Sequence, residues 1–539
     1  MKKVLNFFLF FVTALVLTQG CSKKIDDAYA NPNSPIDGVP QPPDQLLPPI
    51  IYNMAQNEQR DFRTLAAYIQ NFFNRTASNQ WDRMGYIAGS DAGGDIFRMH
   101  YWLIGQNCVK MIKWAQDDKK WDFVGAGQAI FAWSWLTLTD YHGDVILKEA
   151  FKTDQLTFHY DTQDDVYAYV RSLCLQALDN LNKTGDGVNP TVFSTADQYL
   201  LGGDIAKWKK FVYGILARSY NHLSNKADYK PDSVIYYCDK SLQTTADDVT
   251  VKFANNGQND AASFYGPYRG NIANYRQSQF VTDLLLGNNT AFTGVSDPRT
   301  WYYLQLDSLN TTFRGLSPSI GEAVFATNLR PRNFWGSTST ANSIPSNDLK
   351  AKFIFRDASE WPIMTASEVH FMKSEASFRK GDKNTALAEY VKGINESFDL
   401  LTTRFNSNIP LANQITGATK AAFLANPNIV PASSANLTLT HIMMQKYLAL
   451  WGHGMVETWD DLRRFHYLDL DPNTGQQVYR GFTPPTVAAG TLFPDNSGKL
   501  VYRVRPRYNS EYVWNVAELN RIGALNADYH TVECWFSKP

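Results

Sequence analysis

Residues 365–401 carry the pattern that most constrains the fold, two helical segments separated by a glycine turn. They read TASEVHFMKSEASFRKGDKNTALAEYVKGINESFDLL, and Gly381 and Asp382 separate the two segments. Thr365 and Glu368 have the spacing of a capping box at the start of the first segment. The second segment repeats every four residues at Ala386, Tyr390 and Ile394. Helix, tight glycine turn and helix is the unit of tetratricopeptide-like repeats, so this stretch predicts a helical repeat fold.

Other stretches also space their apolar residues as helices do. They are residues 127–144, 162–187, 204–225, 230–244 and 439–465. Thr162 and Asp165 predict a second capping box, and Pro231 suits a first helical turn. We therefore expect a mainly α fold with little β structure. Its helix pairs, about four in number, should lie at about 120–250 and 360–470.

Two regions lack this helical period. Residues 253–350 are rich in Asn, Gly, Ser, Thr and aromatics, and residues 470–539 are loop-rich. Long irregular segments in a compact protein commonly carry function, and interleaved aromatic residues argue against disorder. The sequence thus predicts a loop-rich ligand-binding face on a helical frame. In the tail, residues 503–515 predict extended segments around a turn.

The chain begins MKKVLNFFLFFVTALVLTQGCSKK, a basic start followed by a short apolar run. The run is shorter than the ~20 residues of a spanning helix, and this pattern is typical of a secretory signal. Gly20 before Cys21 resembles the lipobox of bacterial lipoproteins, which implies cleavage after residue 20 and lipidation of Cys21. Residues 21–50, dense in Pro, Asn and Asp, predict a tether, and residues 51–539 the helical domain. The alternative is a plain signal peptide with an incidental cysteine.

Composition excludes some classes of protein. The 51 Lys and Arg nearly balance the 52 Asp and Glu, so no basic field attracts nucleic acid. Cys108, Cys174 and Cys238 lie in helix-like apolar contexts, and the cysteine spacing fits no zinc pattern. We expect buried, inert thiols, with a disulfide as the alternative in an exported protein.

Catalytic motifs are missing from the sequence. It contains no Gly-x-Ser-x-Gly elbow, His-Glu-x-x-His pair or Walker loop. Asp91 and Asp95 suit either a calcium ion or, more commonly, a Gly-rich turn. Glu368 and Glu375 align on one helix, where we expect a cap and a solvated or interhelical charge. We therefore predict a protein that is not an enzyme, with no cofactor and no metal.

Three polar stretches combine aromatic rings with hydroxyl-reading side chains, as sugar-binding sites do. The first is residues 74–86, the second residues 263–271 and the third residues 330–340. The candidate ligand-binding residues are Asn79, Trp81, Arg83, Tyr86, Tyr265, Tyr268, Arg332, Asn333 and Trp335. For each aromatic residue, packing within a loop is the alternative role.

An ordered set of segments resembles the SusD/RagB family of outer-membrane nutrient-binding lipoproteins, closest to its SusD-like, starch-binding branch. The segments are NPNSP (31–35), FAWSWLTLTDYHGDVIL (131–147), YLLGGDIAKWKKFVYGILAR (199–218), SEVHFMKSEASFRKGD (367–382), QKYLALWGHGMVETWDDLRR (445–464) and RVRPRYNSEYVWN (503–515). They span nearly the whole mature chain in the family's order. Residues 253–350 have no counterpart to carry over.

The resemblance implies a SusD-like fold and a lipid-anchored protein at the outer membrane, exposed on the cell surface. Such proteins present glycans or peptides to a SusC-like TonB-dependent transporter and act as its lid. The rival hypotheses are a surface glycoside hydrolase, which needs paired carboxylates in a cleft, a peptide-binding member of the family, and a purely structural assembly protein. The sequence does not choose the nutrient.

Overall fold

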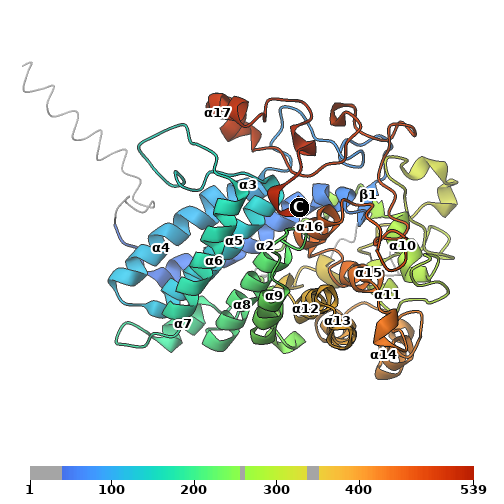
Figure 1. Cartoon of the computed structure of the whole chain (residues 1–539), viewed down its shortest axis with the longest axis horizontal. Coiled ribbons are helices and arrows are strands. Elements are labelled where there is room, and N and C mark those ends of the chain that lie inside the picture. The colour runs from blue at the N-terminus through green and yellow to red at the C-terminus, as the bar shows by residue number, and fades with distance from the viewer. Residues whose placement is uncertain (1–38, 255–261, 337–350) are drawn as a thin grey trace, which may run out of the picture. The chain divides into compact units, whose positions relative to one another are not determined.

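Helices make up most of the residues described by the computed structural model, which are 39–254, 262–336 and 351–539 (Figure 1). The predicted signal segment, Cys21 and most of the predicted tether lie outside these residues. The unit Pro43–Pro539 is one compact body. The mainly α prediction is confirmed for it.

The helical elements follow one another along the whole unit, and they include two π-helices, η1 and η12. In chain order they are α2 (Pro43–Tyr68), α3 (Asp95–Arg98), η1 (Met99–Ile104), α4 (Gly105–Asp117), α5 (Trp121–His142), α6 (Gln163–Asn180), α7 (Pro190–Ala196), α8 (Ile205–Asn221), α9 (Pro231–Lys240), α10 (Gln279–Leu286), α11 (Thr300–Tyr303), α12 (Ala366–Lys380), α13 (Lys383–Arg404), α14 (Gly417–Leu424), α15 (Leu439–Ala449), α16 (Met455–Arg464), η12 (Tyr508–Tyr512) and α17 (Val516–Arg521).

Strands are few and short in the described residues. Strand β1 (Phe72–Asn74) pairs antiparallel with β3 (Tyr275–Gln277), so that Phe72 faces Gln277. Strand β2 (Val249–Val251) pairs antiparallel with β4 (Trp361–Met364). Both sheets have two strands, and they connect loop segments to the helical frame.

Helix pairs form the frame. Helix α5 packs against α6, α8 against α9 and α12 against α13, and α9 also contacts α12, so the pairs stand side by side as an array (Figure 1). Helix α15 packs on α12 and α13. The predicted glycine turn lies where expected, because Gly381 ends α12 with a left-handed φ of 92° and Asp382 caps α13.

Helix α5 lies at the centre of the first half of the array. Helices α4, α6 and α8 and the long helix α2 all contact it. Its rings are buried on every side, including those of Trp133, Trp135 and Tyr141. A helix buried all round needs no amphipathic pattern, which explains why residues 127–144 are apolar over several turns.

The predicted helix starts have mixed outcomes. Pro231 opens α9, as predicted. Thr365 accepts the N–H of Glu368 as a cap, so this half of the predicted capping box is confirmed, whereas the Glu368 side chain bonds to Arg218 instead. The capping box at Thr162 is wrong, because this side chain makes no cap hydrogen bond. Asp165 pairs with Lys148 instead.

Two further expectations need correction. Helix α2 begins at Pro43, so the last part of the predicted 21–50 tether is helical. Residues 503–515 are not purely extended, because η12 forms within them. Of the two alternatives for the charges of Glu368 and Glu375, the interhelical one is confirmed, because both side chains are buried and pair between helices, with Arg218 and Arg464.

The four cysteines after Cys21 are buried and free, as expected. Burial raises the pKa of the Cys108, Cys174 and Cys238 thiols. Thiols held in the neutral form inside an apolar core are inert.

Candidate functional site

A cavity of about 200 Å³ opens between residues 86–94 and residues 503–512. Aromatic, arginine and aspartate side chains line it, among them Tyr86, Asp91, Arg507, Tyr508 and Tyr512. Ligand sites of drug-sized molecules occupy roughly 300–1,000 Å³. This cavity is therefore suited to one ring of a larger ligand rather than to a whole oligomer.

The first wall is a loop that follows strand β1. Both carboxylate oxygens of Asp82 accept the N–H of Asn74, at 3.0 and 3.2 Å, and this closes the loop. Trp81 packs its ring against Tyr68 with 5.7 Å between centroids. Gly93 has a φ of 83°, and a Cβ there would lie 3.0 Å from the Trp81 ring. Only glycine brings the backbone this close to Trp81 in that conformation.

The second wall is an irregular strand held to the frame by hydrogen bonds. The N–H of Val504 donates to the carbonyl of Tyr141 at 2.9 Å, and His142 Nδ1 donates to the Val504 carbonyl at 3.0 Å. Arg505 donates to the carbonyls of Ala524, Asn526 and Ala527. Local sequence alone does not produce this shape, because the hydrogen-bond partners of Val504 and Arg505 all lie in other segments of the chain.

Aromatic rings give the cavity its apolar surface. Tyr508 stacks on Tyr512 with 5.7 Å between centroids, and the Arg505 guanidinium lies 4.6 Å from the Tyr86 ring centre. Tyr508 is 37% exposed, the most exposed aromatic side chain of the lining. Such a ring offers a flat face on which a sugar can stack.

A polar edge adjoins these rings. Asp91 accepts hydrogen bonds from Arg507 and from the backbone and side chain of Asn509. The Arg507 side chain remains a quarter exposed. At the other side, burial lowers the pKa of His530 to about 4, so its ring is neutral at pH 7. A carboxylate beside an arginine offers acceptors and donors to neighbouring hydroxyls.

Asp91 and Asp95 do not converge on one point. Asp91 is bound by Arg507 and Asn509, whereas Asp95 lies 3.8 Å from Arg60. Of the two roles considered from the sequence, the structure favours the glycine-rich turn.

The first predicted stretch is divided between cavity and support. Trp81 and Tyr86 both line the cavity, although the Trp81 side chain is only 4% exposed. Asn79 accepts the Trp81 N–H at 3.0 Å and shapes the turn. Arg83 donates to the carbonyl of Leu492 and packs on Phe493.

The described parts of the other two stretches, residues 263–271 and 330–336, meet in the core instead, and residues 337–340 lie outside the described residues. Tyr265 and Trp335 are both 0% exposed, and both contact the Phe355 ring. Arg332 and Asn333 are buried, and Arg332 donates to Asn310 while Asn333 accepts from Arg276 of β3; Tyr268 is half-buried. In this structure neither Tyr265 nor Trp335 presents a surface to a ligand.

Several residues that line the cavity were not among the predicted site residues, notably Arg505, Arg507, Tyr508 and Tyr512. The signal was present, because RVRPRYNSEY interleaves arginine and tyrosine as the other candidate stretches do. Predicting extended structure for the tail concealed it. The four-residue step from Tyr508 to Tyr512 places both rings on one side of η12.

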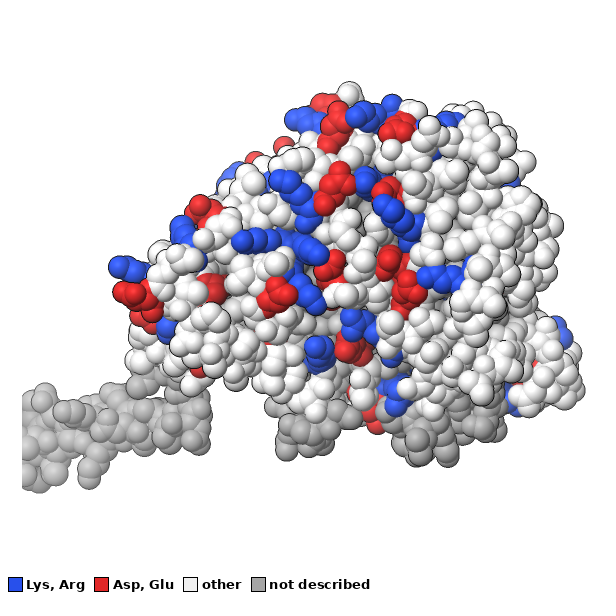
Figure 2. Space-filling model, turned by 90° about the horizontal axis from the view of Figure 1, so that it is seen from below, with Lys and Arg blue, Asp and Glu red and all other residues white. Residues whose placement is uncertain are grey.

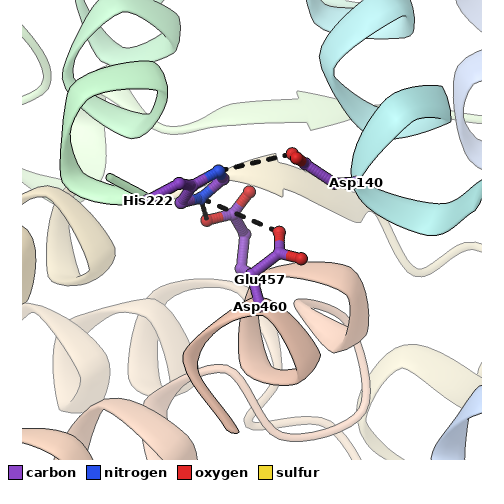
Figure 3. Close-up of side chains that lie close together, drawn as sticks. All are labelled: Asp140, His222, Glu457 and Asp460. Carbon is purple, nitrogen blue, oxygen red and sulfur yellow. Dashed lines mark hydrogen bonds and ion pairs between the residues drawn. The ribbon is translucent and has the colours of Figure 1, made fainter. Parts of the chain in front are cut away.

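A second cluster, deep in the frame, joins His222 with Asp140, Glu457 and Asp460 (Figure 3). Their donor atoms lie within 4.8 Å of one another, close enough for a metal site. Both imidazole nitrogens already face carboxylates, however: Nδ1 lies 3.3 Å from Asp140 and Nε2 3.0 Å from Glu457. These distances suit a charged imidazolium in a carboxylate cage, and a doubly protonated ring has no nitrogen lone pair for a metal.

Comparison with known families is decisive for the class of protein. Residues 35–485 match the SusD-like family described as starch-binding associating with outer membrane. The chain belongs to this SusD-like family. Its family is thus one of binding proteins associated with the outer membrane, and the resemblance noted in the sequence is confirmed. No curated protein matches the chain.

Solved SusD-like structures share the fold. A SusD/RagB family protein from Bacteroides thetaiotaomicron is 20% identical, with a TM-score of 0.64 over 92% of this chain and 99% of that one. A SusD homolog from Bacteroides fragilis is 18% identical, with a TM-score of 0.69 over 92% and 100%. A chitin-binding SusD homolog from Flavobacterium johnsoniae is 16% identical, with a TM-score of 0.66 over 92% and 98%.

The surface of this SusD-like protein carries mixed charge where Figure 2 displays it. Lys and Arg side chains alternate with Asp and Glu across that face. Such a face provides no continuous positive field for a polyanion. Among the described helices, none has both the length and the apolar character required to cross a bilayer.

Proposed function

We propose that this SusD-like protein binds an oligosaccharide at the cavity between residues 86–94 and 503–512. The observation that carries the proposal is the pairing of an exposed tyrosine face with a carboxylate–arginine edge, Tyr508 beside Asp91 and Arg507. Stacking accounts for affinity to the flat face of a sugar ring, and the polar edge accounts for reading its hydroxyls.

The proposal extends to the protein's place in the cell. The basic start, short apolar run and Gly20–Cys21 boundary support a lipid anchor at Cys21, with the helical body tethered to the outer membrane. A SusC-like TonB-dependent transporter is the proposed partner, which receives the ligand while this protein closes over it. Membership of the family supports this partnership.

Delivery requires no covalent step, which agrees with a chain that lacks the sequence motifs tested for catalysis. The ligand is proposed to be a glycan rather than a peptide, because the cavity has one small compartment and ring-lined walls. A peptide instead requires an extended row of backbone partners. Chitin oligomers belong in the test panel because one structural neighbour is a chitin-binding protein.

A glycan and peptide array followed by calorimetric titration tests the proposal. In the Tyr508→Ala variant, affinity for the bound oligosaccharide should fall by about 1–2 kcal/mol, since one stacking face is lost. Trp514→Ala is the matched control, because Trp514 is 68% exposed just beyond η12 and is not part of the cavity lining.

Loss of binding in the Trp514→Ala variant alone would place the site on another face. Binding of peptides but no glycan would support the peptide-binding alternative. Turnover of a glycan that depends on one carboxylate would support the hydrolase alternative.

A further inference from the structure

The buried His222 cluster is built with outer supports around an inner cage. Tyr167 donates its hydroxyl to Asp140 Oδ1, and Arg463 donates to Asp460 Oδ1. Arg218 Nε lies 3.4 Å from Glu457 Oε1. Each carboxylate therefore uses one oxygen on an outer partner and directs the other at the imidazole (Figure 3).

The hydrogen-bond partners favour two protons on the imidazole. The Tyr167 hydroxyl gives its proton to Asp140, so its oxygen can only accept from His222 Nδ1, 3.0 Å away. At the other nitrogen, Nε2 faces the Glu457 carboxylate at 3.0 Å, which also only accepts. Asp140 Oδ2 and Asp460 Oδ2 are buried with no hydrogen-bond partner among the described residues, so their compensation is the ion pair with His222.

Charge balance in the frame leads to the same state. Counted with the adjoining pairs, six buried carboxylates face six cations when His222 is charged. They are Asp140, Glu368, Glu375, Glu457, Asp460 and Asp461, with Arg218, His222, Arg379, Lys446, Arg463 and Arg464. Glu58 is left out of this count because burial raises its pKa to about 8. With a neutral His222, one negative charge would be uncompensated unless a carboxylate took up a proton, and burial and Asp140 raise the pKa of Asp460 in that direction.

The cluster is connected to the second wall of the cavity at two points. Arg463, which holds Asp460, also donates through Nη1 to the Tyr502 carbonyl at 2.8 Å. Tyr141 and His142, which follow Asp140 at the end of α5, hold the N–H and the carbonyl of Val504. Val504 lines the cavity, so the wall is fastened to both sides of the charged cage.

We propose that His222, in its charged form, is a positioning residue for the ligand cavity. Its charge holds Asp140 on α5 and Asp460 on α16 together, and these hold the wall at residues 502–504. The inference about the wall stands on the cluster alone, whereas its effect on affinity rests on the proposed function. Loss of the His222 proton loosens the wall and weakens ligand binding.

The groups that face His222 determine that it loses its proton, and the wall loosens, as the pH rises above neutral. They are Asp140 from α5, Tyr167 from α6, Glu457 and Asp460 from α16 and, one turn back on α8, Arg218; the Phe536 ring closes the remaining side. Burial alone lowers the pKa of His222, but Glu457, Asp140 and Asp460 together raise it well above its ordinary value. A group with a raised pKa in the folded state stabilises it fully below the unfolded pKa, about 6.5, and loses this contribution as pH rises.

Hydrogen exchange at the Val504 amide tests the wall directly. In the wild-type mature protein, its rate relative to the Ile394 amide of α13 should rise between pH 7 and 10, by up to about tenfold per pH unit. His222→Gln should show a faster Val504 rate at pH 7 and little further rise. His441→Gln is the matched control, because burial already lowers the pKa of His441 to about 4.

Glu58 also ionises at alkaline pH, since burial raises its pKa to about 8, but both variants retain it. If the relative exchange rate of Val504 rises with pH in His441→Gln but not in His222→Gln, this rise is caused by the titration of His222. Should His222→Gln fail to fold, the wild-type slope between pH 8.5 and 10, where Glu58 is already mostly ionised, decides, and a constant ratio of the two amide rates there overturns the proposal.

Ligand affinity and metal binding complete the test. His222→Gln should bind the array-selected oligosaccharide about five- to tenfold more weakly than His441→Gln at pH 7. If no ligand binds the wild type, the proposed function fails while the exchange result still stands. Equal affinity in both variants overturns the link to binding. If the wild type binds Zn²⁺ stoichiometrically and His222→Gln does not, the proposed charged state of His222 is wrong.

Discussion

The helix pairs and the cavity wall are held by different kinds of interaction. In α12 and α13, apolar residues recur at helical spacing and the turn between them is a glycine with a capping aspartate. In the wall, the shape comes from Arg505 and Val504, whose partners are backbone carbonyls outside their own turn. The helix pair therefore follows from local sequence signals, whereas the shape of the cavity wall depends on contacts with distant parts of the chain.

The largest effect is expected in the frame. Arg464 is 1% exposed and binds both oxygens of Glu375, at 2.8 and 2.9 Å. Arg464→Met leaves that carboxylate without its main partner in the core and should lower the free energy of unfolding by about 3–5 kcal/mol. Urea denaturation measures the change.

Lys113→Met is the control for this prediction, because Lys113 and its partner Asp117 are both exposed on α4. An exposed pair contributes about 0–1 kcal/mol. Equal losses in the two variants would show that burial does not distinguish the frame's ion pairs from those of the surface.

A slightly smaller effect is expected where an aromatic residue of the loop region belongs to the core. Trp335 is 0% exposed and packs on Phe334 and Phe355. Trp335→Ala should therefore cost about 3–4 kcal/mol of stability. Its affinity for ligand, measured by titration on the folded protein, should stay at the wild-type value. A binding defect with unchanged stability would return Trp335 to the ligand site.

The smallest effect is expected at the first wall of the cavity. Gly93→Ala forces a side chain into a left-handed conformation against Trp81, which should cost about 1–2 kcal/mol. Ligand affinity should fall as well, because Trp81 lines the cavity. Gly270→Ala is the control, since a Cβ there meets no atom within 4 Å and its φ is ordinary. Equal melting temperatures and affinities in both variants would contradict the role given to Gly93.

Much of the frame was predictable from the sequence because its signals are local. The glycine turn at Gly381, the first-turn Pro231 and the helical spacing in residues 204–225 all lie where α8, α9, α12 and α13 need them. The predicted capping box at Thr162 does not form, and the Asp165 side chain pairs with Lys148 instead. Side-chain competition of this kind is invisible to spacing alone.

The site was predictable only in part. Trp81 and Tyr86 lie at the cavity, but the rings of Tyr265 and Trp335 are in the core, although all four come from similar stretches of sequence. An aromatic residue in a loop can face a ligand or the core, and the choice depends on segments far along the chain. Tyr508 and Arg507 were overlooked for the same reason, because their wall takes its shape from Tyr141 and His142.

A crystal structure of the mature protein with the oligosaccharide selected by the array would locate the bound sugar. We predict a sugar ring against the Tyr508 face, with its hydroxyls bonded to Asp91 and Arg507. A sugar bound at any other surface, with this cavity unchanged and unoccupied, would contradict it.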